Sequence, residues 1–282
     1  GQYAPYIERL LAELSLENVA LLSLQSENSY AGLGGTEFTL RIWSAMIVSD
    51  MMSDIRSVLL ANAIDRNRTL EIYDRQIDLL RQTFETGGDL GRVSRTLDMI
   101  ALNLRAIPVR RALEETPRIL LTGEIFVRHD GLSRQWLVEK LAEHGFAVKV
   151  SSVMEWVYYT DWCFQNGFNN RTPDLSEKLL LRMRASWMKK YEKTYKSIMA
   201  RSSLLPFHME DIGHVIATAG RHIHPALTGE AVLTVGAALN DIVDQYCGVI
   251  AIGPFGCMPN RLAESILSRE MNRPDLAFGS PR

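Results

Sequence analysis

Short apolar runs alternate with longer amphipathic stretches along this chain. Four runs, at residues 19–24, 118–122, 147–150 and 249–252, are mostly apolar and too short for a buried helix. Apolar runs of this length are typical of strands that are buried on both faces of a parallel sheet. We therefore predict four parallel strands at these positions.

Helical spacing dominates the rest of the chain. Residues 38–114 contain no strand pattern, and their apolar positions recur every three or four residues. We predict helices over residues 70–84 and 90–106 within this block. Further helices are predicted over residues 3–14, 133–144, 175–201, 228–246 and 259–267. Ser133 and Thr228 are placed as the N-caps of two of these helices, because a side-chain hydroxyl can accept a hydrogen bond from the first turn.

The order of these elements indicates the fold class. A strand at residues 118–122, a helix and a second strand at 147–150 form a strand–helix–strand unit of roughly 30 residues. Such a unit makes a right-handed crossover between parallel strands. The chain is therefore predicted to be an α/β protein with parallel sheet units and a large helical block, in which residues 1–116 form a partial α/β segment followed by the helical block.

Composition excludes several classes of function. The 282 residues include 31 basic and 33 acidic side chains, a net charge of −2. Nucleic-acid binders need an excess of cations, so no nucleic-acid partner is expected. The longest uncharged stretch, residues 245–260, contains glycine and proline and is too short to span a membrane. Only three cysteines occur, without a C-x-x-C pair, so a reducing cytoplasmic location is expected. Because the chain starts at Gly1, we expect it to be a piece of a longer protein.

Two loops that follow predicted strands carry the candidate chemistry. Cys257 lies after the strand at 249–252 and just before a helix, where free N–H groups and the helix dipole stabilise a thiolate. The alternative is a small buried residue in a tight turn. Glu124 and Arg128 follow the strand at 118–122, where ligands of α/β sheets bind. The alternative there is a solvated loop.

Several sequence blocks together resemble one known superfamily. They read G-Q-Y at residues 1–3, S-E-N-S-Y at 26–30, G-E-I-F-V-R at 123–128, H-P followed by G-E-A at 224–231, and G-P-F-G-C-M-P at 253–259. They are similar to the 2-hydroxyacyl-CoA dehydratase / benzoyl-CoA reductase superfamily, and most of all to its acyl-CoA dehydratase activase-related subgroup. The resemblance covers nearly the whole chain.

The resemblance implies a fold and a cofactor. It implies that residues 117–282 form a Rossmann-like α/β domain with a helical insertion at about 171–220. Relatives hold an iron–sulfur cluster, such as a 4Fe-4S cluster, with cysteines from several loops, and Cys257 matches one of these ligands. The residues expected around the cofactor are Gly253, Pro254, Phe255, Gly256, Cys257, Glu124 and Arg128. In relatives a cysteine closely precedes the G-Q-Y block, so this piece alone is expected to hold an incomplete cluster and to be inactive.

The resemblance also implies partners and a reaction. An ATP-dependent activase domain or subunit would drive low-potential electron transfer to a cluster that reduces CoA thioesters, a chemistry of anaerobic metabolism. Two other interpretations stay open at this point. The chain could be a docking or regulatory domain for the activase, or a small-molecule-binding α/β domain without a cluster. A homodimer is a further possible assembly.

Overall fold

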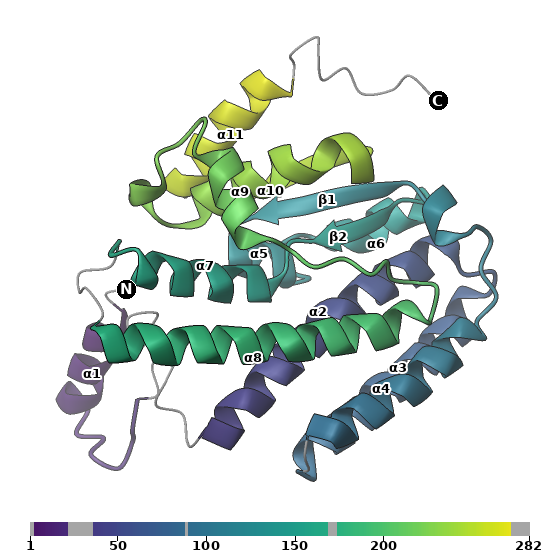
Figure 1. Cartoon of the computed structure of the whole chain (residues 1–282), viewed down its shortest axis with the longest axis horizontal. Helices are drawn as coiled ribbons and strands as arrows, with labels where there is room; N and C mark the ends of the chain where they lie inside the picture. Colours follow the sequence, from purple (N-terminus) through teal and green to yellow (C-terminus); the bar gives the residue numbers. More distant parts are fainter. Residues whose placement is uncertain (1–2, 22–35, 88–89, 169–173, 272–282) are drawn as a thin grey trace.

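The computed structural model describes residues 3–21, 36–87, 90–168 and 174–271 (Figure 1). About 67% of the described residues are helical, and one small parallel sheet lies among the helices. The first helices are α1 (Tyr3–Glu13), α2 (Thr36–Asn62), α3 (Arg66–Glu85) and α4 (Leu90–Arg105). The strands are β1 (Arg118–Gly123), β2 (Ala147–Val150) and β3 (Gly248–Ile252). The other helices are α5 (Ile125–His129), α6 (Leu137–Glu143), α7 (Val153–Gln165), α8 (Leu175–Ala200), α9 (Ile212–Ala219), α10 (Glu230–Gln245) and α11 (Met258–Glu270).

The three strands form a parallel sheet in the order β2-β1-β3, which confirms the predicted parallel pairing of these segments. The central strand β1 pairs Arg118 with Ala147 of β2 and Gly123 with Ile252 of β3. The fourth predicted strand is not found: residues 19–21 are irregular, and residues 22–24 lie outside the described residues. Val19 is 51% exposed, so this apolar run does not enter the core there.

Helices cover the sheet from both sides. Figure 1 shows α9, α10 and α11 on one side of the sheet and α2, α7 and α8 on the other. A small apolar cluster of Leu121, Val138, Val148 and Val150 joins the sheet to α6. A much larger cluster joins α2, α3 and α4 to α7, α8, α9 and α10. This larger core crosses residue 116, and the predicted division of the chain at that position stays a prediction.

Helix α2 closes the outer edge of the sheet. The N–H of Val148 on β2 donates a 2.6 Å hydrogen bond to Oγ of Ser57 on α2. An uncovered edge strand leaves its backbone groups unpaired and open to association with other chains. The long helical block predicted before residue 114 therefore has a structural role, because it protects β2.

Two predicted N-caps are wrong, one by three residues and the other by a single residue. Helix α6 begins at Leu137 rather than after Ser133, because the Asp130 carboxylate accepts the N–H of Ser133 at 2.6 Å and holds a turn there. The backbone then passes through the left-handed region at Gln135 and Trp136, with φ of 52° and 57°. Helix α10 is capped by Gly229 rather than Thr228, because the cap has a φ of 85°, which favours glycine.

Candidate functional site

The carboxyl ends of the strands bring the loops after β1 and β3 into direct contact. The N–H of Glu124 donates a 2.8 Å hydrogen bond to the carbonyl of Ile252. Gly123 adopts a φ of 108°, and a Cβ at this position would lie 2.0 Å from the same carbonyl oxygen. Only glycine fits here, so the close approach of the two loops is built into the sequence.

Glu124 is the N-cap of helix α5. One of its carboxylate oxygens accepts the N–H of Val127 at 2.8 Å, which satisfies a donor in the first turn. The neighbouring N–H of Ile125 donates to Glu230 of α10 at 2.9 Å. Burial raises the pKa of Glu230. Glu230 therefore fixes the loop after β1 against α10, while Glu124 caps α5.

Arg128 is a buried link between the strand ends. Its side chain is 1% exposed and donates to the carbonyls of Gly123 at 2.7 Å and Ser152 at 3.3 Å. His129 lies beside it, with Nε2 3.1 Å from the carbonyl of Ser151. Burial, together with the charge of Arg128, lowers the pKa of His129 to about 4, so the ring is neutral at pH 7. Arg128 and His129 therefore hold the loops after β1 and β2 together.

Cys257 lies at the N-cap of α11, in the loop after β3. The N–H of Cys257 donates to the carbonyl of Pro254 at 3.0 Å, which closes a tight turn. Its thiol is partly exposed, whereas the flanking Phe255 and Met258 are 93% and 78% exposed. The guanidinium of Arg261 lies 5.6 Å from the centre of the Phe255 ring. The exposed apolar side chains of Phe255 and Met258 therefore lie on either side of the thiol, at the carboxyl end of the strands.

The predicted cofactor-binding residues thus gather at one edge of the sheet. Residues 253–257 form the loop after β3, and Glu124 and Arg128 belong to the adjoining loop. Glu124 and Arg128 make the structural contacts described above, and their binding role stays a prediction.

The other two cysteines lie elsewhere. Cys163 is buried in α7, and burial raises the pKa of its thiol. Cys247 is exposed at the amino end of β3, where its N–H and thiol both donate to the carbonyl of Arg118. All three thiols are free. Within the described ranges, no three or more His, Cys, Asp or Glu side chains are grouped so that they could hold a metal ion.

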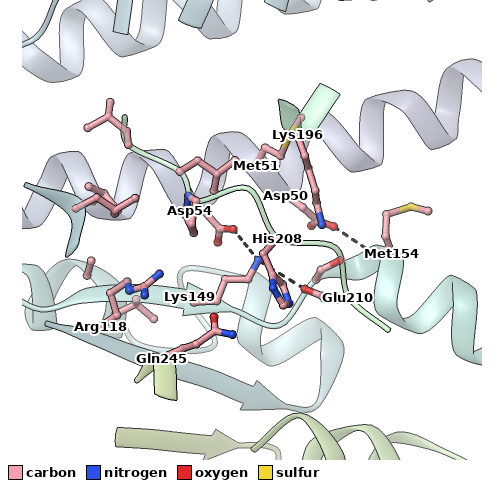
Figure 2. A pocket seen from close by; sticks show the side chains of 18 of the residues that line it. Asp50, Met51, Asp54, Arg118, Lys149, Met154, Lys196, His208, Glu210 and Gln245 are labelled. Carbon is pink, nitrogen blue, oxygen red and sulfur yellow. Dashed lines mark hydrogen bonds and ion pairs between the residues drawn. The ribbon is translucent and has the colours of Figure 1, made fainter. Parts of the chain in front are cut away.

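A second polar centre lies inside the protein, around Lys149 (Figure 2). Its ammonium is 2.6 Å from a carboxylate oxygen of Asp54 on α2 and 4.0 Å from one of Glu210. Glu210 belongs to the connection between α8 and α9. Asp50, one turn before Asp54, accepts the N–H groups of Val153 and Met154 at the start of α7. Lys149 thus joins the sheet, α2 and the α8–α9 connection.

Burial and the neighbouring charges shift the pKa values of this centre in opposite directions. Burial raises the pKa of Asp50, and it raises the pKa of Asp54 to about 6, although the Lys149 ammonium opposes both shifts. Burial alone would lower the pKa of Lys149, but the carboxylates of Asp54 and Glu210 more than offset it, so this pKa is raised. Lys149 therefore stays protonated and cannot act as a nucleophile or base at neutral pH.

The cavity beside Lys149 is small. Its volume is about 60 Å³, which suits a few water molecules rather than a substrate. His208 and Arg118 also line it. The one sign of this centre in the sequence is a lysine inside an otherwise apolar strand, with two aspartates spaced by four on a helix. We interpret the centre as structural.

Comparisons with known proteins identify no relative. A scan against protein-family models gives no match to this chain, and searches of curated proteins and of solved structures give no significant match either. Nor does any helix within the described ranges combine the length and the apolar character that crossing a membrane requires.

Proposed function

We propose that this chain is a cluster-binding domain of a 2-hydroxyacyl-CoA dehydratase-type redox system, and that Cys257 supplies one thiolate to an iron–sulfur cluster. The observation that carries the proposal is the position of Cys257: a partly exposed thiol at the N-cap of α11, in a loop at the carboxyl edge of a parallel sheet. Ligands of open α/β sheets bind at this edge. Thiolates are the usual ligands of such clusters.

The described residues do not make a complete cluster site. Cys163 and Cys247 lie in the core and at the opposite end of β3, and no group of three or more ligands occurs among the described side chains. Cys257 would therefore be one ligand of a site that another segment or chain completes. The exposed Phe255 and Met258 beside the thiol are apolar surface that such a second component would cover.

The finer parts of the proposal rest on the sequence resemblance. They are a Rossmann-like arrangement around the three strands, an ATP-dependent activase as partner, a CoA thioester as substrate and a cytoplasmic location. A bound cluster would supply one-electron transfer. The protein's own contribution would be to hold the thiolate at a fixed place, through the Cys257–Pro254 turn and the contact between the loops after β1 and β3.

Metal analysis of cysteine variants tests the proposal. The full-length natural protein is reconstituted anaerobically, and iron and acid-labile sulfide are measured for the wild type, Cys257→Ala and the control Cys247→Ala. We expect Cys257→Ala to lose most of the iron and Cys247→Ala to keep it. Full iron content in Cys257→Ala contradicts the proposal. A wild type that binds an activase but takes up no iron favours a docking domain instead.

A further inference from the structure

A second pocket opens at the carboxyl edge of the sheet. Its volume is about 290 Å³, and its walls come from the end of β3, helix α5, the turn before α6 and helix α6 itself. The residues that line it are Val127, Ser133, Arg134, Gln135, Leu137, Lys140, Ile252 and Gly253. Pockets for small molecules start near 300 Å³, so the space suits a small ligand or one end of a larger one.

The pocket lies at the point in the sheet where ligands are expected. From β1 the chain crosses to β2 on one side and later to β3 on the other, so the direction of the connections reverses between β1 and β3. In open parallel sheets the crevice outside such a reversal is the usual ligand site. The end of β3, at Ile252 and Gly253, forms one wall of the pocket.

The polar lining is cationic. Arg134 and Lys140 line the pocket, and no carboxylate is among the described residues that do so. Arg134 forms an ion pair with Glu139, whose Oε2 is 4.0 Å from Nη2 of the arginine. The other oxygen of Glu139 is held by Arg56 at 2.8 Å. Glu139 and Asp130 therefore offset part of the Arg134 charge, and neither of them lines the pocket.

Arg134 also has an unused donor. Its side chain is 11% exposed, and one Nη group donates to the carbonyl of Arg128 at 2.9 Å. Its Nε–H is buried and has no hydrogen-bond partner. The Nε atoms of Arg41 and Arg128 are buried in the same way, so the Nε of Arg134 does not by itself mark a ligand site. The next residue, Gln135, has a φ of 52°, and strained backbone of this kind clusters at binding sites.

We propose that this pocket binds the phosphate or diphosphate group of a small ligand, with Arg134 and Lys140 as its cationic contacts. A guanidinium offers paired donors that match phosphate oxygens, and a lysine adds a compact positive charge. Cys257 does not line the pocket, although Gly253 of the same loop does. A mutation of Cys257 should therefore leave the phosphate site intact.

Calorimetric titration tests this site on the whole chain at low salt. The ligands are inorganic phosphate, pyrophosphate and, as a carboxylate probe, acetate. We expect pyrophosphate to bind more tightly than phosphate and acetate to show no binding. Stronger binding of inorganic phosphate than of pyrophosphate would indicate a site for the free ion and overturn the proposal that the phosphate or diphosphate group of a ligand binds here. No binding of either phosphate compound overturns the proposal.

Matched variants locate the site. Lys140→Gln removes an exposed charge and should leave the fold intact. Arg134→Gln removes the largely buried guanidinium group. Each should weaken pyrophosphate binding by about tenfold, the value of one charge-assisted contact. Lys190→Gln, an equal charge change at an exposed position of α8, should leave affinity unchanged. Unchanged affinity in Lys140→Gln, or equal loss in Lys190→Gln, overturns the assignment. Unchanged affinity in Cys257→Ala separates this site from the cluster.

Discussion

Lys149→Met tests whether a buried ion pair contributes more to the stability of this protein than a surface ion pair does. Methionine has a similar length, so the packing of the side-chain stem is largely kept. The change leaves Asp54 and Glu210 without the ammonium that lies 2.6 and 4.0 Å from their oxygens. Removing one partner of a buried pair costs about 3–5 kcal/mol, because the remaining charge is buried and uncompensated.

The structure places this variant near the lower end of that range. The side chains of Lys149 and Asp54 are 24% and 12% exposed, so water reaches part of the pair. We therefore expect a loss of about 3 kcal/mol at pH 8. For a chain of this size that loss should lower the melting temperature by roughly 6 °C or more.

The pH dependence of this loss follows from Asp54. The pKa of Asp54 is about 6 in the folded protein, above its ordinary value of 3.8, so the folded state binds this proton more tightly than the unfolded state. Protonation below pH 6 therefore stabilises the folded state. Without Lys149 the pKa should rise further, and the deficit of the variant should shrink between pH 8 and pH 5.

Urea and thermal unfolding, followed by circular dichroism at pH 8 and pH 5, measure the effect. The control is Arg201→Met, which breaks the Arg201–Asp98 pair whose side chains are 58% and 47% exposed. Exposed pairs contribute at most about 1 kcal/mol, so this variant should change little. Equal losses in the two variants, or a Lys149→Met deficit that grows at pH 5, would refute the reasoning.

Three further outcomes follow from the structure. Gly123→Ala should lower the free energy of unfolding by at least about 2 kcal/mol, because its new Cβ would overlap the backbone of β3. Gly167→Ala, at a positive φ of 74° but with open space around it, should lower it by only about 1 kcal/mol. Similar losses for the two variants in urea unfolding would contradict this reasoning. The ring of His129 should titrate near pH 4 by NMR, and the stability that it contributes should be lost as the pH falls from 6.5 to 4; a midpoint near 6.5 would contradict its burial. Iodoacetamide should modify exposed Cys247 well before buried Cys163, and equal rates by mass spectrometry would show that α7 opens.

Much of the sheet could be predicted from sequence. The apolar runs that became β1, β2 and β3 are short and are followed by glycine or helix-capping residues, so pattern and turn chemistry agree. The run at residues 19–24 is similarly apolar, but its described part, residues 19–21, is irregular and mostly exposed. A single apolar run does not show whether other elements will cover it, because burial is a property of the whole fold.

The candidate site was less accessible to sequence reasoning. Because Glu124 and Cys257 each follow a predicted strand, the sequence placed their loops at the same end of the sheet, where the structure has them. The sequence could not show that Arg128 would turn inward to backbone carbonyls, because that depends on the loop after β2, more than 20 residues further along the chain. Lys149 and Asp54 are 95 residues apart in the sequence, so no local sequence pattern predicts that they form an ion pair.

The central claim is that Cys257 is a cluster ligand at the carboxyl edge of this sheet. The most direct measurement is the iron content of the anaerobically reconstituted full-length natural protein, compared between wild type and Cys257→Ala. Our account predicts that the wild type binds iron and sulfide and that the variant loses most of both. A Cys257→Ala protein that folds normally and retains the full iron content of the wild type would contradict it.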